Sequence, residues 1–322
     1  MTVCADCNVC LDSLRQLRYA PFVKLRPPVG RDSNVPRAER HPGNVPHHQA
    51  MSTLTPGRPM SKKRGKSMTI SPFRNLVIDL LHFSQKVPCV TLDRTMRLAP
   101  LIAARRLCER APMWTSILIK AYGLVAARQP LLRRCYLDFP WPRYYEHPKN
   151  IANVNIYRRV DDEDVILQAL IRSPENRSLT ELDDILRRYM ELPVETFDSY
   201  RRARRASRLP RFLRRLVMWA SIHWLGRRRA HNFGTFGITS VCDRGAGILN
   251  TIPLGASLLH YGLFDEQGGL HVRLAIDHRV LDGASGADAL VSLEQTLLGE
   301  ILDEVTSLGQ PPVIPLIEKQ AA

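Results

Sequence analysis

The stretch HVRLAIDHRVLDGA, which runs from His271 to Ala284, contains the most informative pattern of the chain. Its first six residues are typical of a short β-strand, and Asp277, His278 and Arg279 follow where that strand ends. An imidazole has an unperturbed pKa of about 6.5, so His278 can accept a proton at neutral pH. We therefore expect His278 to act as a general base.

Two residues after the histidine fit the same interpretation. Asp282 stands four residues beyond His278 and can fix the local backbone by pairing with an arginine, and Gly283 permits a tight turn into a following helix. A base in this position suits the attack of a thiol on a thioester, because only a few per cent of an ordinary thiol is ionised at pH 7.

Helices and strands alternate on both sides of this stretch. Apolar spacing predicts helices at Pro72–Phe83, Leu98–Glu109, Ser116–Arg128, Arg211–Trp224 and Ala287–Leu302, and a capping box at Ser178 and Glu181 predicts one that ends near Met190. Strands are expected at Val87–Leu92, Asn150–Tyr157, Phe233–Val241, Ala256–Tyr261 and His271–Ile276. This order predicts an α/β (α+β) sandwich with a mixed sheet flanked by helices.

The motif DHRVLDGA resembles the HxxxDG signature of the chloramphenicol acetyltransferase superfamily. It is most similar to the catalytic domain of dihydrolipoamide acyltransferases, the core subunits of 2-oxo acid dehydrogenase complexes. Further segments resemble that domain in the same order, from about Ser71 to Leu298: Arg74 with Pro88 in VPCVTL, IKA at Ile119–Ala121, NI at Asn150–Ile151, GTFGITSV at Gly234–Val241, and IPLGASLLHYG at Ile252–Gly262.

The resemblance implies a CoA-dependent acyltransferase, with acyl-CoA as substrate, coenzyme A as co-substrate, no permanently bound cofactor and no metal. His278 would deprotonate a thiol, and Thr239 would donate a hydrogen bond to the oxyanion. Asp282 would pair with Arg74 as a support of the site. In the family, three identical subunits assemble and the histidine and the hydroxyl come from different chains, so a homotrimer is expected and the monomer should be inactive.

The chain also departs from the family. Ser240 stands where the family has asparagine, and Val241-Cys242 replaces its Leu-Gly pair. We find no lipoyl domain and no peripheral subunit-binding domain before the catalytic region, so the acceptor is not identified. Two alternatives stay open: a non-catalytic trimeric scaffold, and an acyltransferase that acts on a lipoylated carrier supplied in trans.

The composition divides the chain into three parts. Residues 1–67 are rich in Pro, Gly, His and Arg, and are expected to form a disordered basic tail. An acyltransferase-like domain follows at 68–303, with a basic helical insertion at about 192–230, and 304–322 forms a C-terminal tail. Within the first part, Cys4, Cys7 and Cys10 have a CxxCxxC spacing, which is too weak a signal to predict a zinc site.

The formal charge of +15 is concentrated in two places. Residues 1–67 hold 12 basic and 4 acidic side chains, and Arg201–Arg229 contains eleven arginines and no acid. Such local patches favour a phosphate-bearing ligand or an anionic surface and make nucleic-acid binding unlikely.

The arginine-rich segment allows three interpretations. Its arginines contact the phosphates of CoA, or it is a helix with a solvated basic face, or residues 211–229 lie on anionic lipid as an interfacial helix. In the third case, Arg211, Arg214 and Arg215 would face the lipid beside apolar residues: Phe212, Leu213, Leu216, Val217, Trp219 and Trp224.

Seven cysteines in a chain too long to need disulfides indicate reduced thiols. The N-terminus lacks the pattern of a signal peptide, and the longest nearly apolar run, Leu216–Gly226, is too short to span a bilayer. A cytoplasmic protein is expected, with peripheral membrane attachment as the alternative.

Overall fold

The computed structural model describes residues 65–160, 163–241, 245 and 247–309. The CxxCxxC motif, nearly all of the basic tail and residues 310–322 lie outside these ranges. Residues 70–309 fall within one compact unit, which is described here by itself.

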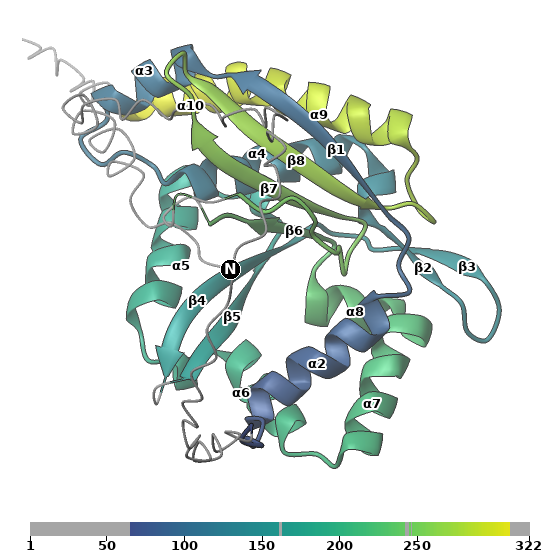
Figure 1. The fold of residues 1–322 in the computed structure, drawn as a ribbon. Helices are drawn as coiled ribbons and strands as arrows, with labels where there is room; N and C mark the ends of the chain where they lie inside the picture. Colours follow the sequence, from purple (N-terminus) through teal and green to yellow (C-terminus); the bar gives the residue numbers. More distant parts are fainter. Residues whose placement is uncertain (1–64, 161–162, 242–244, 246, 310–322) are drawn as a thin grey trace, which may run out of the picture. The chain divides into compact units, whose positions relative to one another are not determined.

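A six-stranded mixed sheet organises this unit and confirms the expected fold class (Figure 1). Its strands lie in the order β1-β8-β7-β6-β4-β5, and β6 runs parallel to both β4 and β7 while the other neighbours are antiparallel. A separate two-stranded sheet pairs β2 with β3. The strands are β1 (Cys89–Arg97), β2 (Arg134–Leu137), β3 (Arg143–Glu146), β4 (Ile151–Val160), β5 (Glu163–Arg172), β6 (Phe236–Thr239), β7 (Ser257–Phe264) and β8 (Gly269–Asp277).

Helices enclose the main core on one side of this sheet. They are α3 (Ala99–Leu107), α4 (Trp114–Arg128), α5 (Leu179–Glu191), α9 (Gly283–Leu298) and α10 (Glu300–Gly309). Figure 1 shows α3, α9 and α10 beside one another next to β1. The most deeply buried of them is α4, which explains why its sequence is apolar almost all round.

Short polar signals set two helix starts. The side chains of Ser178 and Glu181 form the predicted capping box at α5. Asp282 caps α9, because its carboxylate accepts a hydrogen bond from the backbone N–H of Ser285 at 2.7 Å.

Gly234, before β6, has a φ of +79°, and a Cβ there would lie 2.8 Å from the carbonyl oxygen of Ile151. Only glycine fits this position.

The basic insertion folds into a helical layer of its own. It contains the short η4 (Val194–Thr196), then α6 (Asp198–Ser207), α7 (Arg211–Trp219), the π-helical η5 (Ala220–Trp224) and α8 (Gly226–Phe233). With α2 (Pro72–Ser84) it adds a second, smaller core beside β5, made of Val165, Leu167, Val194 and Tyr200 with Phe73 and Phe197 packed against them.

Two predicted boundaries are wrong. The last predicted helix, Ala287–Leu302, is two helices, and α10 continues to Gly309, so the expected tail cannot begin at 304. The predicted helix Arg211–Trp224 is α-helical only to Trp219 and continues as a π-helical turn.

Candidate active site

His278 follows the last residue of β8 and its side chain is exposed. Its Nδ1 lies 2.9 Å from the carbonyl oxygen of Leu281. A carbonyl can only accept, so Nδ1 carries the proton and Nε2 is the nitrogen with the free lone pair. Among the described residues Nε2 has no hydrogen-bond partner. The imidazole is therefore held in the tautomer that a general base requires, with its basic nitrogen open.

Both neighbours of the histidine in the chain are fixed. Asp277 is fully buried and accepts hydrogen bonds from Nε and Nη2 of Arg279 at 2.9 and 2.7 Å. The Arg279 guanidinium also lies over the ring of Tyr136, 4.9 Å from its centre. Burial lowers the pKa of Arg279, but the bonds and charge of Asp277 outweigh this effect and raise it. The backbone N–H of His278 donates to the carbonyl of Pro88, so the base is anchored to β1 as well.

Asp282 and Arg74 are not brought together. Asp282 caps α9 instead. The hydrogen bond that its carboxyl group accepts from the backbone of Ser285 lowers the pKa of that group. Arg74 is exposed near the start of α2, and among the described residues no ion pair joins it to Asp282. The expected support of the site by this pair is therefore absent within one chain.

Gly283 does not serve a tight turn. It is the first residue of α9, its φ is not positive, and a Cβ built on it would meet nothing within 4 Å. A larger side chain would therefore fit at this position without a clash.

Thr239 ends β6, and its hydroxyl is a buried group without a hydrogen-bond partner among the described residues. Its side chain is covered, with 1% of the residue exposed, and a substrate reaches it only if its surroundings move. The next residue, Ser240, donates its hydroxyl to the carbonyl of Tyr261. The hydroxyl of Thr239 is thus a buried donor that no described residue satisfies.

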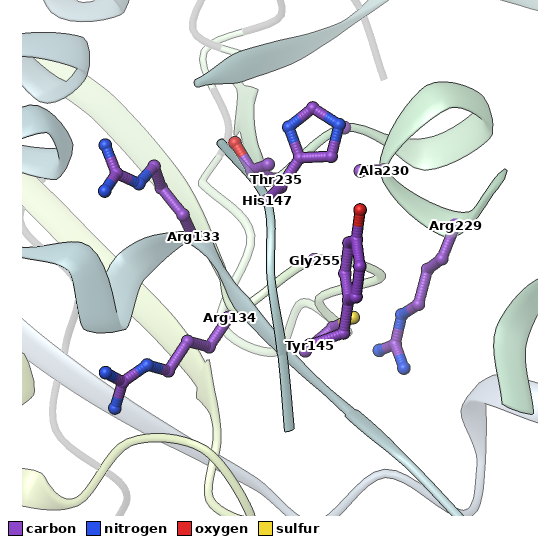
Figure 2. A pocket seen from close by; sticks show the side chains of 10 residues that line it. Arg133, Arg134, Tyr145, His147, Arg229, Ala230, Thr235 and Gly255 are labelled. Carbon is purple, nitrogen blue, oxygen red and sulfur yellow. The ribbon is translucent and has the colours of Figure 1, made fainter. Parts of the chain in front are cut away.

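Two cavities lie at the end of the sheet that carries His278. The smaller one is drawn in Figure 2, which shows Arg133, Tyr145, His147 and Arg229 around it. Its volume of about 10 Å³ accommodates about one water molecule, which excludes it as an acyl-CoA site.

The larger cavity, of about 350 Å³, reaches the size of small-molecule sites. Its lining includes basic groups, Arg172, Arg177, Arg202 and His231, one acid, Asp198, and apolar residues such as Ile151 and Leu170. Arg172 donates to Nδ1 of His231 at 2.8 Å. Burial and the nearby arginines lower the pKa of His231, so this imidazole is neutral at pH 7.

Among the arginines considered for contact with CoA or lipid, Arg214 is not accessible in this fold. Arg214 is buried and donates to Asp79 of α2 at 2.6 Å, and Arg215 donates to the same carboxylate at 2.8 Å. Burial raises the pKa of Asp79, but the hydrogen bonds from Arg215 and Arg214 outweigh this effect and hold it below its usual value. Arg229 is also buried and donates to three backbone carbonyls, those of Tyr136, Ile222 and Leu254.

Sequence reasoning missed Asp79, the Asp277–Arg279 pair and the larger cavity. One signal for the first was present, because Asp79 is the single acidic residue of a largely apolar helix. The cavity residues come from five separate elements, so no local pattern identifies them.

The fold defines the class of structure. The described residues have the fold of the catalytic domain of 2-oxo acid dehydrogenase acyltransferases, with a six-stranded mixed sheet and the histidine at the end of β8. No protein-family model matches the sequence, and no curated protein matches it.

Three solved structures illustrate the likeness. A probable dihydrolipoamide acetyltransferase from Listeria monocytogenes superposes with a TM-score of 0.53 at 15% identity, over 73% of this chain and 94% of that one. The catalytic core of the 2-oxoacid dehydrogenase complex from Thermoplasma acidophilum gives 0.51 at 17%, over 73% and 99%. The dihydrolipoamide acetyltransferase of Azotobacter vinelandii gives 0.53 at 16%, over 77% and 98%.

Proposed function

We propose that the protein is a CoA-dependent acyltransferase with His278 as its general base. The observation that carries the proposal is the bond from His278 Nδ1 to the carbonyl of Leu281, since it leaves Nε2 unprotonated and open. The Azotobacter vinelandii enzyme has been studied for the role of a serine, a histidine and an asparagine in its mechanism, and the last two are four residues apart. His278 and Asp282 have the same spacing.

The reaction uses this nitrogen twice. Nε2 takes the proton from the S–H or O–H of the acceptor as that atom attacks the thioester carbonyl of acyl-CoA. The hydroxyl of Thr239 donates to the oxyanion of the tetrahedral intermediate. When the intermediate collapses, the bond between the carbonyl carbon and the CoA sulfur breaks, and the imidazolium returns its proton to the sulfur.

The site requires more than one copy of the chain. Thr239 is level with Arg273, five residues before His278, so the hydroxyl that faces a given His278 would come from another subunit. A homotrimer, in which each boundary builds one site, satisfies this requirement and agrees with the resemblance to the acyltransferase family.

The larger cavity supports a site for the phosphates of CoA. Arg177 and Arg202 provide guanidinium groups, which suit phosphate recognition. Backbone hydrogen bonds connect Asp277 to Ala256, Ala256 to Thr235 and Thr235 to Ile151, which lines the cavity. The cavity is therefore about three strand spacings, roughly 14 Å, from the base, a gap for the extended pantetheine arm to cross.

The release of CoA from acetyl-CoA tests this function. We expect the purified full-length protein to release CoA in the presence of a thiol acceptor, and the His278→Ala variant to lose this activity. Free dihydrolipoamide and a lipoylated domain serve as alternative acceptors and distinguish a carrier supplied in trans from another acceptor. A protein that neither binds acyl-CoA nor releases CoA would instead be the non-catalytic scaffold.

A further inference from the structure

Helix α7 buries a charged side chain and exposes apolar ones. Arg214 and Met218, one turn apart, form its buried face, whereas Phe212 is 76% exposed and Leu216 is 58% exposed. A surface helix ordinarily buries its apolar stripe and exposes its charges. Here a charged residue, Arg214, is buried, and Phe212 and Leu216 have no covering partner among the described residues.

Specific hydrogen bonds hold α7 in this orientation, with Arg214 buried and Phe212 exposed. Asp79 of α2 is buried and accepts from both Arg214 and Arg215, and Nη1 of Arg214 also donates to the carbonyl of Leu209. Rotating α7 to cover Phe212 and Leu216 would break these contacts and leave the Asp79 carboxylate buried without a partner, which is strongly unfavourable. The exposure of the two apolar residues is therefore a stable feature of the fold.

Further aromatic side chains extend this surface. Trp224 is 45% exposed, and the ring of Phe139 packs against it and against Trp219, at 5.4 and 5.2 Å between centres. Arg143 donates to the carbonyls of Trp224 and Trp141 and so connects the loop between β2 and β3 to η5. The docking face consists of six exposed apolar residues: Phe139, Trp141, Phe212, Leu216, Val217 and Trp224.

Positive charge accompanies the docking face. Residues 199–241 contain no acidic side chain. The arginines of this segment that are exposed are Arg201, Arg204, Arg205, Arg208, Arg211, Arg227 and Arg228. Two exposed acids adjoin this region, and both are paired: Asp138 with His223 and Asp198 with Arg201. Apolar and aromatic side chains next to an excess of positive charge match a bilayer with anionic headgroups, which offers hydrocarbon to the former and phosphate to the latter.

We propose that the docking face binds the surface of an anionic lipid bilayer, with Phe212 and Leu216 inserted among the lipids and the exposed arginines on the phosphates. Tryptophan at such a boundary is favourable, because its ring prefers the headgroup region. No helix among the described residues is long and apolar enough to cross a membrane, so attachment through these residues is peripheral.

The docking face also lies near the candidate base. The ring of Phe83, at the end of α2, contacts the ring of His223 in η5 at 5.9 Å. Five residues further along the chain, the carbonyl of Pro88 accepts the backbone N–H of His278. If the proposed acyl transfer is correct, docking brings His278 close to acceptors in the membrane, but the docking itself does not depend on that activity.

Vesicle flotation tests the proposal. The full-length protein is mixed with vesicles of phosphatidylcholine alone or with 30 to 40% phosphatidylglycerol, a composition chosen for charge. We expect binding to the anionic vesicles that weakens as salt rises. The double variant Phe212→Ser/Leu216→Ser and the double variant Arg208→Glu/Arg228→Glu should each bind at least about tenfold more weakly.

Matched controls make the result specific. Leu107 is as exposed as Phe212 but lies on α3, so Leu107→Ser with Arg106→Glu should bind like the wild type. His278→Ala should also bind normally, which separates this proposal from the acyl transfer. Equal binding by all variants would overturn the proposal. An absence of binding to anionic vesicles would also overturn it. If Phe212→Ser/Leu216→Ser then changed only the oligomeric state, the docking face would be a contact between copies of the chain.

Discussion

Thr239 and His278 of one chain lie far apart in the sheet. Thr239 of β6 is level with His260 of β7, which is level with Arg273 of β8. His278 follows Arg273 by five residues, or roughly 17 Å along the strand, and β7 separates the two strands. The two side chains of one chain cannot touch the same reacting carbonyl, so the proposed chemistry requires a second copy.

Replacing His278 by alanine removes the proposed base. We expect the rate of CoA release to fall by at least about a hundredfold, the scale of general-base catalysis. The fold should persist, because the side chain is exposed and its backbone bond to Pro88 is unchanged. His271→Ala is the matched control, since His271 is exposed on β8 and its Nδ1 lies 3.1 Å from the hydroxyl of Thr95. Equal rates for His278→Ala and wild type would reject the base.

Replacing Thr239 by valine removes a hydroxyl while keeping the shape of the side chain. The hydroxyl is buried and unsatisfied, so stability should be unchanged or increased, whereas the rate should fall about a hundredfold if it stabilises the oxyanion. Thr235→Val is the contrast, because its hydroxyl accepts from the backbone of Ile151 at 2.9 Å. That change should cost about 1 kcal/mol in urea unfolding. A Thr239→Val enzyme with the wild-type rate would exclude this donor.

Replacing Asp79 by asparagine leaves Arg214 buried without its anionic partner. We expect a loss of about 3 kcal/mol in the free energy of unfolding at pH 7. The pKa of Asp79 is lower in the folded chain than in the unfolded one, so its stabilisation is complete above about pH 4 and is lost as the pH falls further. Asp79→Asn should therefore lose less stability than wild type between pH 5 and about pH 2.

A surface pair is the control for that experiment. Asp184 pairs with Arg110, and both side chains are more than half exposed. Asp184→Asn should cost less than about 1 kcal/mol. If Asp79→Asn were no more destabilising than Asp184→Asn, the rigid attachment of α7 to α2 would be disproved.

Replacing Arg177 and Arg202 by glutamine tests the proposed phosphate site. We expect the KM for acyl-CoA to rise at least about tenfold with little change in kcat, because these groups would bind ground state and transition state equally. Arg188→Gln, on an exposed position of α5, should change neither constant. An unchanged KM in the double variant would place the phosphates elsewhere.

Local patterns in the sequence were sufficient for most of the main-sheet elements. The capping box at Ser178 and the strand before His278 are formed by neighbouring residues, and the structure contains both. The second strand of the β4–β5 pair was missed because Glu163–Arg172 follows a charged turn and begins with two acids. Its place at the sheet edge depends on pairing with β4, which no pattern within the strand specifies.

The candidate site was predictable only in part. The position of His278 at a strand end follows from its own segment, but its tautomer depends on the carbonyl of Leu281 and could not be predicted. The pairing of Arg74 with Asp282 was expected from resemblance, and the structure uses Asp282 for a helix cap instead. The exposed arginines and the buried Arg214 have the same local composition, so the position of Asp79 distinguishes them.

Mixed assembly of two inactive variants tests the central claim most directly. His278→Ala and Thr239→Val chains are unfolded together, refolded in equal amounts, and assayed for CoA release. If each site takes its histidine from one chain and its hydroxyl from another, random trimers regain about a quarter of the wild-type activity. A mixture no more active than the two variants measured separately would contradict a site shared between subunits.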